Sequence, residues 1–128
     1  MQNRILIVED DAIVATQLQR TLHKMDFESV GPVATGEEAI EIALRELPDC
    51  ILMDIKLKGE LSGIDAADRI HKIAEIPVIY LTAYADENTL AKAKVTEPYD
   101  YIIKPFKEID LHTSIEMALY KHGKEQEI

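Results

Sequence analysis

The chain has 128 residues, the size of one domain, and a net charge of −10 from 24 acidic and 14 basic residues. Nucleic acids and anionic membrane surfaces bind clustered Lys and Arg, so neither is an expected partner of a chain with this charge. There is no apolar run of bilayer-spanning length, no signal-peptide pattern and no second cysteine to pair with Cys50. We therefore expect a cytoplasmic protein without a membrane segment, in which Cys50 is buried.

The first half of the chain alternates apolar runs of strand length with amphipathic stretches of helical spacing. We expect strands at Arg4–Val8, at Glu28–Val33 (a short edge strand that contains Gly31 and Pro32) and at Cys50–Met53. One predicted helix spans Ala12–Lys24 after a cap at Asp11, with Ile13, Leu18, Leu22 and Met25 facing inward. A second opens at Thr35 and Gly36 and ends at Pro48, with Ala39, Ile40, Ala43, Leu44 and Leu47 inward.

The second half continues the alternation after a polar loop at Ile55–Ser62. A helix is expected at Ile64–Ala74 with Ile64, Ala67, Ile70 and Ile73 facing inward, followed by a strand at Val78–Leu81. Asp86–Val95 is a weaker helix, because its apolar residues lie among polar neighbours, and we expect it to pack least firmly. The last strand is Tyr99–Ile103, and a final helix at Lys107–Lys121 carries Leu111, Ile115, Ala118 and Leu119 on one face.

Strict alternation of strand and helix predicts a parallel sheet with right-handed crossovers and helices on both faces, an α/β/α arrangement of three layers. We assign residues 1–122 to this domain and residues 123–128 to a polar tail or to the start of a helical linker.

Each predicted strand of the interior ends in polar residues. Glu9 and Asp10 follow the first strand, Asp54 follows the third, and Thr82 and Lys104 follow the last two. Because the carboxyl ends of parallel strands lie at one edge of a sheet, where open α/β sheets bind their ligands, we expect these five side chains to meet.

Clustered carboxylates repel one another, and a hard divalent cation such as Mg²⁺ relieves that repulsion. A carboxylate is also a nucleophile toward phosphorus, and phosphoryl transfer requires positive charge near the equatorial oxygens. In this interpretation Asp54 is the nucleophile, Lys104 the fixed cation and Thr82 a hydroxyl donor to a phosphoryl oxygen. Simpler interpretations exist for single residues: Asp11 is a helix cap, and Tyr101 or Thr82 on its own is an ordinary strand residue.

Four stretches taken together resemble the signatures of response-regulator receiver domains. They are ILIVEDD (5–11), LMDIKL (52–57), VIYLTA (78–83) and DYIIKPF (100–106), and the resemblance covers residues 3–120 in order and spacing. It implies a flavodoxin-like, doubly wound sheet of five parallel strands in the order 2-1-3-4-5 with five helices. It also implies that Asp54 accepts a phosphoryl group from a histidine kinase or a histidine phosphotransfer protein.

The resemblance further implies roles for the residues around Asp54. Mg²⁺ would be held by Asp10, Asp54 and the backbone carbonyl of Lys56, with Glu9 acting through water. In addition, Thr82 and Tyr101 would form a switch pair, in which the threonine moves toward the phosphoryl group and the tyrosine turns inward. The bond between Lys104 and Pro105 is expected to be cis.

The chain departs from the family pattern in three places. Gly63 lies nine positions after Asp54 (63 − 54), one more than usual, and the loop lacks the usual proline, so we expect a different loop shape. Lys56 and Tyr84 stand beside the site, where they would affect the access of water and the lifetime of the acyl phosphate. Residues 96–99 (TEPY) stand where the family often has a Gly-Ala pair.

The function favoured by the sequence is a phosphorylation-controlled switch rather than an enzyme that turns over a substrate. Its output would be a changed surface around the last two strands and helices, acting on a protein partner or through a homodimer.

A flavodoxin-like cofactor carrier is the alternative, although acids after the first strand would repel a flavin phosphate. A dehalogenase-type phosphatase fits less well, because it needs its nucleophile after the first strand. Both a stand-alone regulator and a receiver segment of a larger sensor kinase are compatible with the chain.

Overall fold

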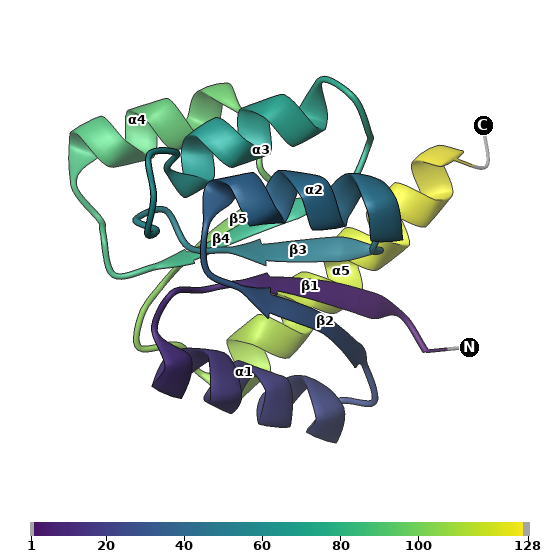
Figure 1. Cartoon of the computed structure of the whole chain (residues 1–128). Coiled ribbons are helices and arrows are strands. Elements are labelled where there is room, and N and C mark those ends of the chain that lie inside the picture. The colour runs from purple at the N-terminus through teal and green to yellow at the C-terminus, as the bar shows by residue number, and fades with distance from the viewer. Residues whose placement is uncertain (1, 127–128) are drawn as a thin grey trace.

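The computed structural model describes residues 2–126, and the side chains as far as Gly123. Five strands and five helices alternate along the chain (Figure 1). The strands are β1 (Arg4–Val8), β2 (Glu28–Val33), β3 (Cys50–Met53), β4 (Val78–Thr82) and β5 (Asp100–Ile103). The helices are α1 (Ala12–Lys24), α2 (Gly36–Glu46), α3 (Gly63–His71), α4 (Glu87–Val95) and α5 (Glu108–Gln126).

The strands form one parallel sheet in the order β2-β1-β3-β4-β5, as the resemblance implied. Because the order reverses direction after β1, the sheet is doubly wound, with α1 and α5 on one face and α2, α3 and α4 on the other (Figure 1). The carboxyl ends of all five strands point to the left-hand side of Figure 1.

Two apolar clusters fill the spaces between the layers. Alternate residues of the central strands supply both: Leu6 and Ile51 face α2 and α3, whereas Ile5 and Leu52 face α1 and α5. The continuous apolar runs of β1, β3 and β4 are therefore explained by burial on both faces. Cys50 is fully buried among them, as predicted.

Three predictions of inward-facing residues are wrong, and each concerns a helix end. Ile13 is 75% exposed because the buried stripe of α1 begins at Ala15, about 200° further round the helix. Leu47 is exposed because it ends α2 in a left-handed conformation with φ of 46°. Ile73 is exposed because α3 ends at His71, two residues earlier.

Helix α4 is thinly packed, in agreement with the prediction from its sequence. Ala93 is its only buried residue, and Val95 at its end is 80% exposed. No helix within residues 2–126 is long and apolar enough to cross a membrane. The predicted tail at 123–128 is helical as far as Gln126, and its last two residues lie outside the described part of the chain.

Candidate functional site

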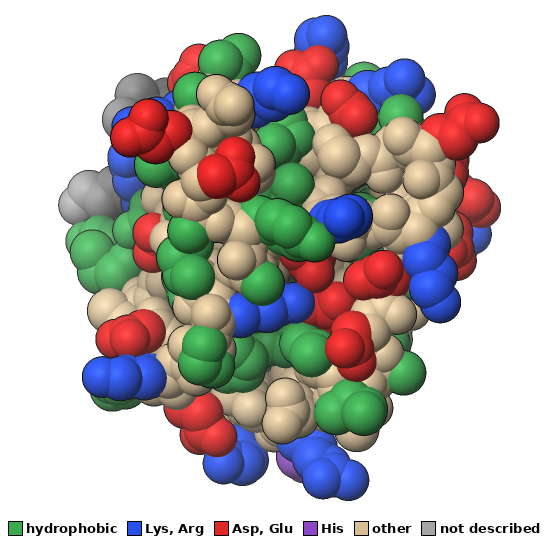
Figure 2. Space-filling model, turned by 90° about the vertical axis from the view of Figure 1, so that its left-hand side faces the viewer, with side chains coloured by type: hydrophobic (Ala, Val, Ile, Leu, Met, Phe, Trp, Pro, Cys, Tyr) green, Lys and Arg blue, Asp and Glu red, His purple; other side chains and the backbone are tan. Residues whose placement is uncertain are grey.

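Two carboxylates are fixed at the edge of the sheet by the backbone that carries them. The Glu9 N–H donates to the Val33 carbonyl (2.9 Å), and the Asp54 N–H donates to the Val8 carbonyl (3.0 Å). These bonds extend the sheet past the last residues of β1 and β3. Glu9 is 4% exposed and Asp54 is 8% exposed, so both acids are nearly buried. Figure 2 faces this edge, where acidic and basic side chains meet near the centre of the view.

Asp10 completes an acidic cluster. Carboxylate oxygens of Glu9, Asp10 and Asp54 all lie within 4.8 Å of one another. Charges at that separation repel by roughly 3–4 kcal/mol per pair at an effective dielectric constant near 20. Because Mg²⁺ prefers a few carboxylates and retains several waters, this donor set fits a magnesium site. The Asp11 side chain takes no part in the cluster: as predicted, it caps α1 by accepting from the N–H groups of Ile13 and Val14.

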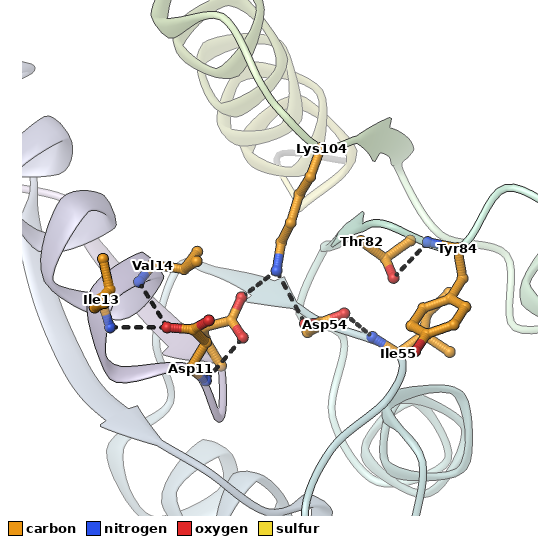
Figure 3. Close-up of polar contacts among 9 residues, drawn as sticks. Asp11, Ile13, Val14, Asp54, Ile55, Thr82, Tyr84 and Lys104 are labelled. Carbon is orange, nitrogen blue, oxygen red and sulfur yellow. Dashed lines mark hydrogen bonds and ion pairs between the residues drawn. The ribbon is translucent and has the colours of Figure 1, made fainter.

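Lys104 brings positive charge into the cluster from the end of β5, an edge strand of the sheet. It follows β5, and its ammonium group donates to Oε1 of Glu9 and to Oδ2 of Asp54, the latter at 3.0 Å (Figure 3). Burial acts to lower the pKa of Lys104, but its bonds to the two carboxylates outweigh burial and raise that pKa. Burial raises the pKa of Glu9, and the bonds that Glu9 accepts from Lys104 and from the Asp11 N–H offset this only in part.

Asp54 is held from both sides. Its Oδ1 accepts from the Ile55 N–H at 2.7 Å, and its Oδ2 accepts from Lys104 (Figure 3). The arrangement joins a fixed carboxylate, a fixed cation and donors for a divalent cation in one nearly buried place. Chemically it is suited to accept a phosphoryl group on Asp54.

The loop after Asp54 ends at Gly63, which packs against the backbone of Asp54 and Ile55. A Cβ atom added at Gly63 would lie 1.9 Å from the Asp54 carbonyl oxygen, and the Gly63 N–H donates to the Ile55 carbonyl (2.6 Å). Thus only glycine fits at this position. The sequence showed the unusual spacing of Gly63 but not this contact.

The same loop is also attached to the start of α2. Glu37 accepts from the Leu61 N–H (3.2 Å), and Thr35 and Lys58 form an isolated parallel bridge. From the sequence, Glu37 was only an acid of the first helical turn. A carboxylate at a helix start, 24 residues before its loop partner, carries no signal of that contact.

The two residues expected to act as a switch pair both bind the backbone of Tyr84. Thr82 is fully buried, and its Oγ1 accepts from the Tyr84 N–H at 3.2 Å (Figure 3). The Tyr101 hydroxyl donates to the Tyr84 carbonyl. Lys56, the expected carbonyl ligand, is exposed, with its ammonium nitrogen 5.4 Å from the centre of the Tyr84 ring. The bond between Lys104 and Pro105 is cis.

Known proteins resemble this chain over most of its length. Residues 5–116 match the family model of the response regulator receiver domain. Transcriptional regulatory protein PdtaR of Mycobacterium tuberculosis is 35% identical over 116 residues, which cover 91% of this chain and 56% of the relative. Phyllosphere-induced regulator PhyR of Methylorubrum extorquens is 34% identical over 121 residues, 94% of this chain and 45% of the relative. The chain thus spans about half the length of these two proteins.

Solved structures extend the likeness to the whole fold. The signal receiver domain of a modulated diguanylate cyclase from Desulfovibrio desulfuricans is 36% identical, with a TM-score of 0.92, and the match covers 98% of this chain and 99% of that one. The receiver domain of a sensor histidine kinase from Pseudomonas aeruginosa is 30% identical, with a TM-score of 0.85, covering 93% of this chain and 98% of that one. The latter structure holds a magnesium ion in its active-site cleft.

Proposed function

The chain belongs to the family of response regulator receiver domains of two-component systems, and from that premise we propose that Asp54 is its phosphoacceptor. The observation that carries the proposal is the Lys104 ammonium group, which is bonded to Glu9 and Asp54 at once. A fixed cation at a buried carboxylate prepares that carboxylate for a group that brings further negative charge.

The donor in this proposal is the phosphohistidine of a histidine kinase or of a histidine phosphotransfer protein. A carboxylate oxygen of Asp54 attacks the phosphorus atom, the new P–O bond forms, and the P–N bond to the donor imidazole breaks. The imidazole nitrogen leaves and takes a proton from solvent. Lys104 balances charge on the phosphoryl oxygens, and Thr82 turns its hydroxyl group from the Tyr84 N–H toward one of them.

Glu9, Asp10, Asp54 and the backbone carbonyl of Lys56 are the residues that would hold Mg²⁺. The acidic cluster supports this assignment, and so does the magnesium ion in the Pseudomonas aeruginosa relative. When bound, the ion neutralises charge on the transferring phosphoryl group.

The result of phosphorylation in this proposal is a change of surface. Thr82 and Tyr101 both bind Tyr84 in the unmodified protein, so movement of Thr82 toward the phosphoryl group would disturb the loop between β4 and α4. The domain would take part in its own phosphorylation and in the later hydrolysis of the acyl phosphate. It would act as a switch rather than as an enzyme with a separate substrate.

Incubation with acetyl phosphate or phosphoramidate and Mg²⁺, followed by intact-mass measurement, tests the assignment. The wild type should gain one phosphoryl group, and Asp54→Asn should gain none. Asp11→Asn is the matched control, because Asp11 lies at the same edge of the sheet but caps α1, and Asn caps equally well. Labelling of Asp54→Asn at the wild-type rate would disprove the proposal.

A further inference from the structure

Tyr84 is held at three points by three different segments of the chain. Its N–H group is bound to Thr82 on β4, and its carbonyl is bound to Tyr101 on β5. Its ring lies under the ammonium group of Lys56, which belongs to the loop between β3 and α3. The first two contacts involve only backbone atoms of Tyr84, whereas the third involves its side chain; the residue is 41% exposed.

The contact with Lys56 is weak and can be exchanged for a stronger one. A cation above an aromatic ring is attracted by the charge distribution of the ring, but only modestly at an exposed site. Among the side chains described, those up to Gly123, Lys56 forms no ion pair, unlike Lys104, which is held by two carboxylates. An anion placed near Lys56 would therefore compete with the Tyr84 ring without first breaking a salt bridge.

Phosphorylation of Asp54 would place such an anion two residues away. A phosphoryl group carries up to about two negative charges near neutral pH, and charge-assisted hydrogen bonds to its oxygens are stronger than an exposed contact between a cation and a ring. The ring of Tyr84 and the carboxylate of Asp54 lie on the same open edge of the sheet (Figure 3). A phosphoryl group on Asp54 would therefore compete with the Tyr84 ring for Lys56.

We propose that Lys56 and the Tyr84 ring form a latch that holds the loop between β4 and α4 in the unmodified protein, and that a phosphoryl group on Asp54 opens it by drawing Lys56 away. The opening step rests on the proposed function, whereas the closed latch does not. The helix that follows this loop, α4, buries only Ala93, so few buried contacts oppose a change in the loop. Lys56 thus provides a second connection between Asp54 and α4, separate from Thr82.

The closed latch is tested in the unmodified protein. Lys56→Met removes the charge and keeps most of the aliphatic stem, and amide hydrogen exchange of Tyr84 measured by NMR should become about three- to fivefold faster, as expected for loss of one exposed cation–ring contact. Lys58→Met is the matched control, because Lys58 is an exposed lysine in the same loop, and it should leave the exchange rate unchanged. Equal rates in the wild type and both variants would overturn the latch.

A double-mutant cycle identifies the ring as the partner of Lys56. Tyr84→Phe keeps the ring and should behave like the wild type, whereas Tyr84→Leu removes it. In the Tyr84→Leu background, Lys56→Met should change the exchange rate of residue 84 by less than about 1.5-fold, because the contact is already absent. An undiminished effect of Lys56→Met in that background would show that Lys56 acts elsewhere and would overturn the latch.

Opening is tested by the position of Lys56 relative to the ring. In the unmodified protein the ε-methylene protons of Lys56 should show the upfield shift of groups above an aromatic ring, and the shift should vanish in Tyr84→Leu. It should also vanish when acetyl phosphate labels Asp54, with labelling followed by intact mass. A shift that persists in fully labelled protein would overturn the opening step and leave the proposed function standing. Failure of Asp54 to label would refute the proposed function, while the measurements on unmodified protein would still decide the closed latch.

Discussion

The edge of the sheet that carries Asp54 and the segment that follows Thr82 are built in opposite ways. All four residues of β3 are buried, and so are the last four of β1. By contrast, β5 has no fully buried residue and α4 has one. We call the first region (β1, β3 and the residues at their ends) the tight half and the second (the loop after β4, α4 and β5) the loose half.

The difference separates two physical requirements of a switch. A reacting carboxylate must be held in position, because small displacements of reacting groups are costly in rate. A surface that changes must rearrange at a small cost in free energy, and local opening is easiest where few apolar contacts are buried. Lys104 joins the two halves, because it follows β5 and its ammonium group reaches Glu9 and Asp54 in the tight half. Tyr84, in the loose half, donates its N–H to Thr82 on β4 and accepts from Tyr101 on β5.

The largest expected effect comes from crowding the tight half. In Gly63→Ala the new methyl group would meet the Asp54 carbonyl oxygen at 1.9 Å, so the backbone of one of the two must move. We expect the free energy of unfolding to fall by about 3 kcal/mol in urea titrations. Gly123→Ala is the control, since nothing lies within 4 Å of its added Cβ, and it should be neutral or slightly stabilising. A loss below about 1 kcal/mol for Gly63→Ala would mean that the tight half yields easily.

Stability at alkaline pH should test the burial of the Cys50 thiol in the tight half. Burial raises the pKa of the Cys50 thiol from 9.0 to about 12, so between these values the unfolded chain loses a proton that the folded chain keeps. Stability therefore falls as pH rises, by up to about 1.4 kcal/mol per pH unit from this group. Urea titrations at a series of alkaline pH values should show the decline, and Cys50→Ala should reduce its slope. Equal slopes in the two proteins would contradict the burial of the thiol.

Smaller effects are expected where β4 contacts the end of α4. The buried Thr96 hydroxyl donates to the Ala93 carbonyl (2.6 Å), so the Tyr80 hydroxyl is the donor in its 2.7 Å bond with Thr96. Tyr80→Phe removes one donor and should cost about 1 kcal/mol. Thr96→Val should cost about 2 kcal/mol, because it leaves the Tyr80 hydroxyl buried without a partner. Urea titrations give both values. A Tyr80→Phe variant as unstable as Thr96→Val would count against this account.

The central strands β1, β3 and β4 were predictable because burial on both faces leaves a simple pattern. The runs at β1 and β3 are apolar to their last residue, so the positions of Glu9 and Asp54 at the sheet edge followed directly. The exposure of Ile13, Leu47 and Ile73 was not predictable from spacing, because periodicity does not show where a helix ends relative to the sheet. The thin packing of α4 was visible in its composition.

Contacts between loops left less trace in the sequence. Lys56 and Tyr84 were each expected near Asp54, but their mutual contact depends on the shapes of two loops that no periodic pattern describes. The bond between Tyr80 and Thr96 joins a core strand to the end of α4, and neither residue type predicts that contact. The sequence thus indicates which groups reach the site more readily than it indicates how they are paired.

The position of Lys104 in the chain has a consequence for biosynthesis. Lys104 lies 95 residues after Glu9 and 50 after Asp54, the two acids that it joins. Because ribosomes build a chain from its N-terminus, the carboxylates at the ends of β1 and β3 are complete well before their counter-ion exists. When β3 has just emerged from the ribosome, the negative charges of these carboxylates are not yet neutralised by Lys104. The lysine reaches them only when β5 has emerged and joined the sheet.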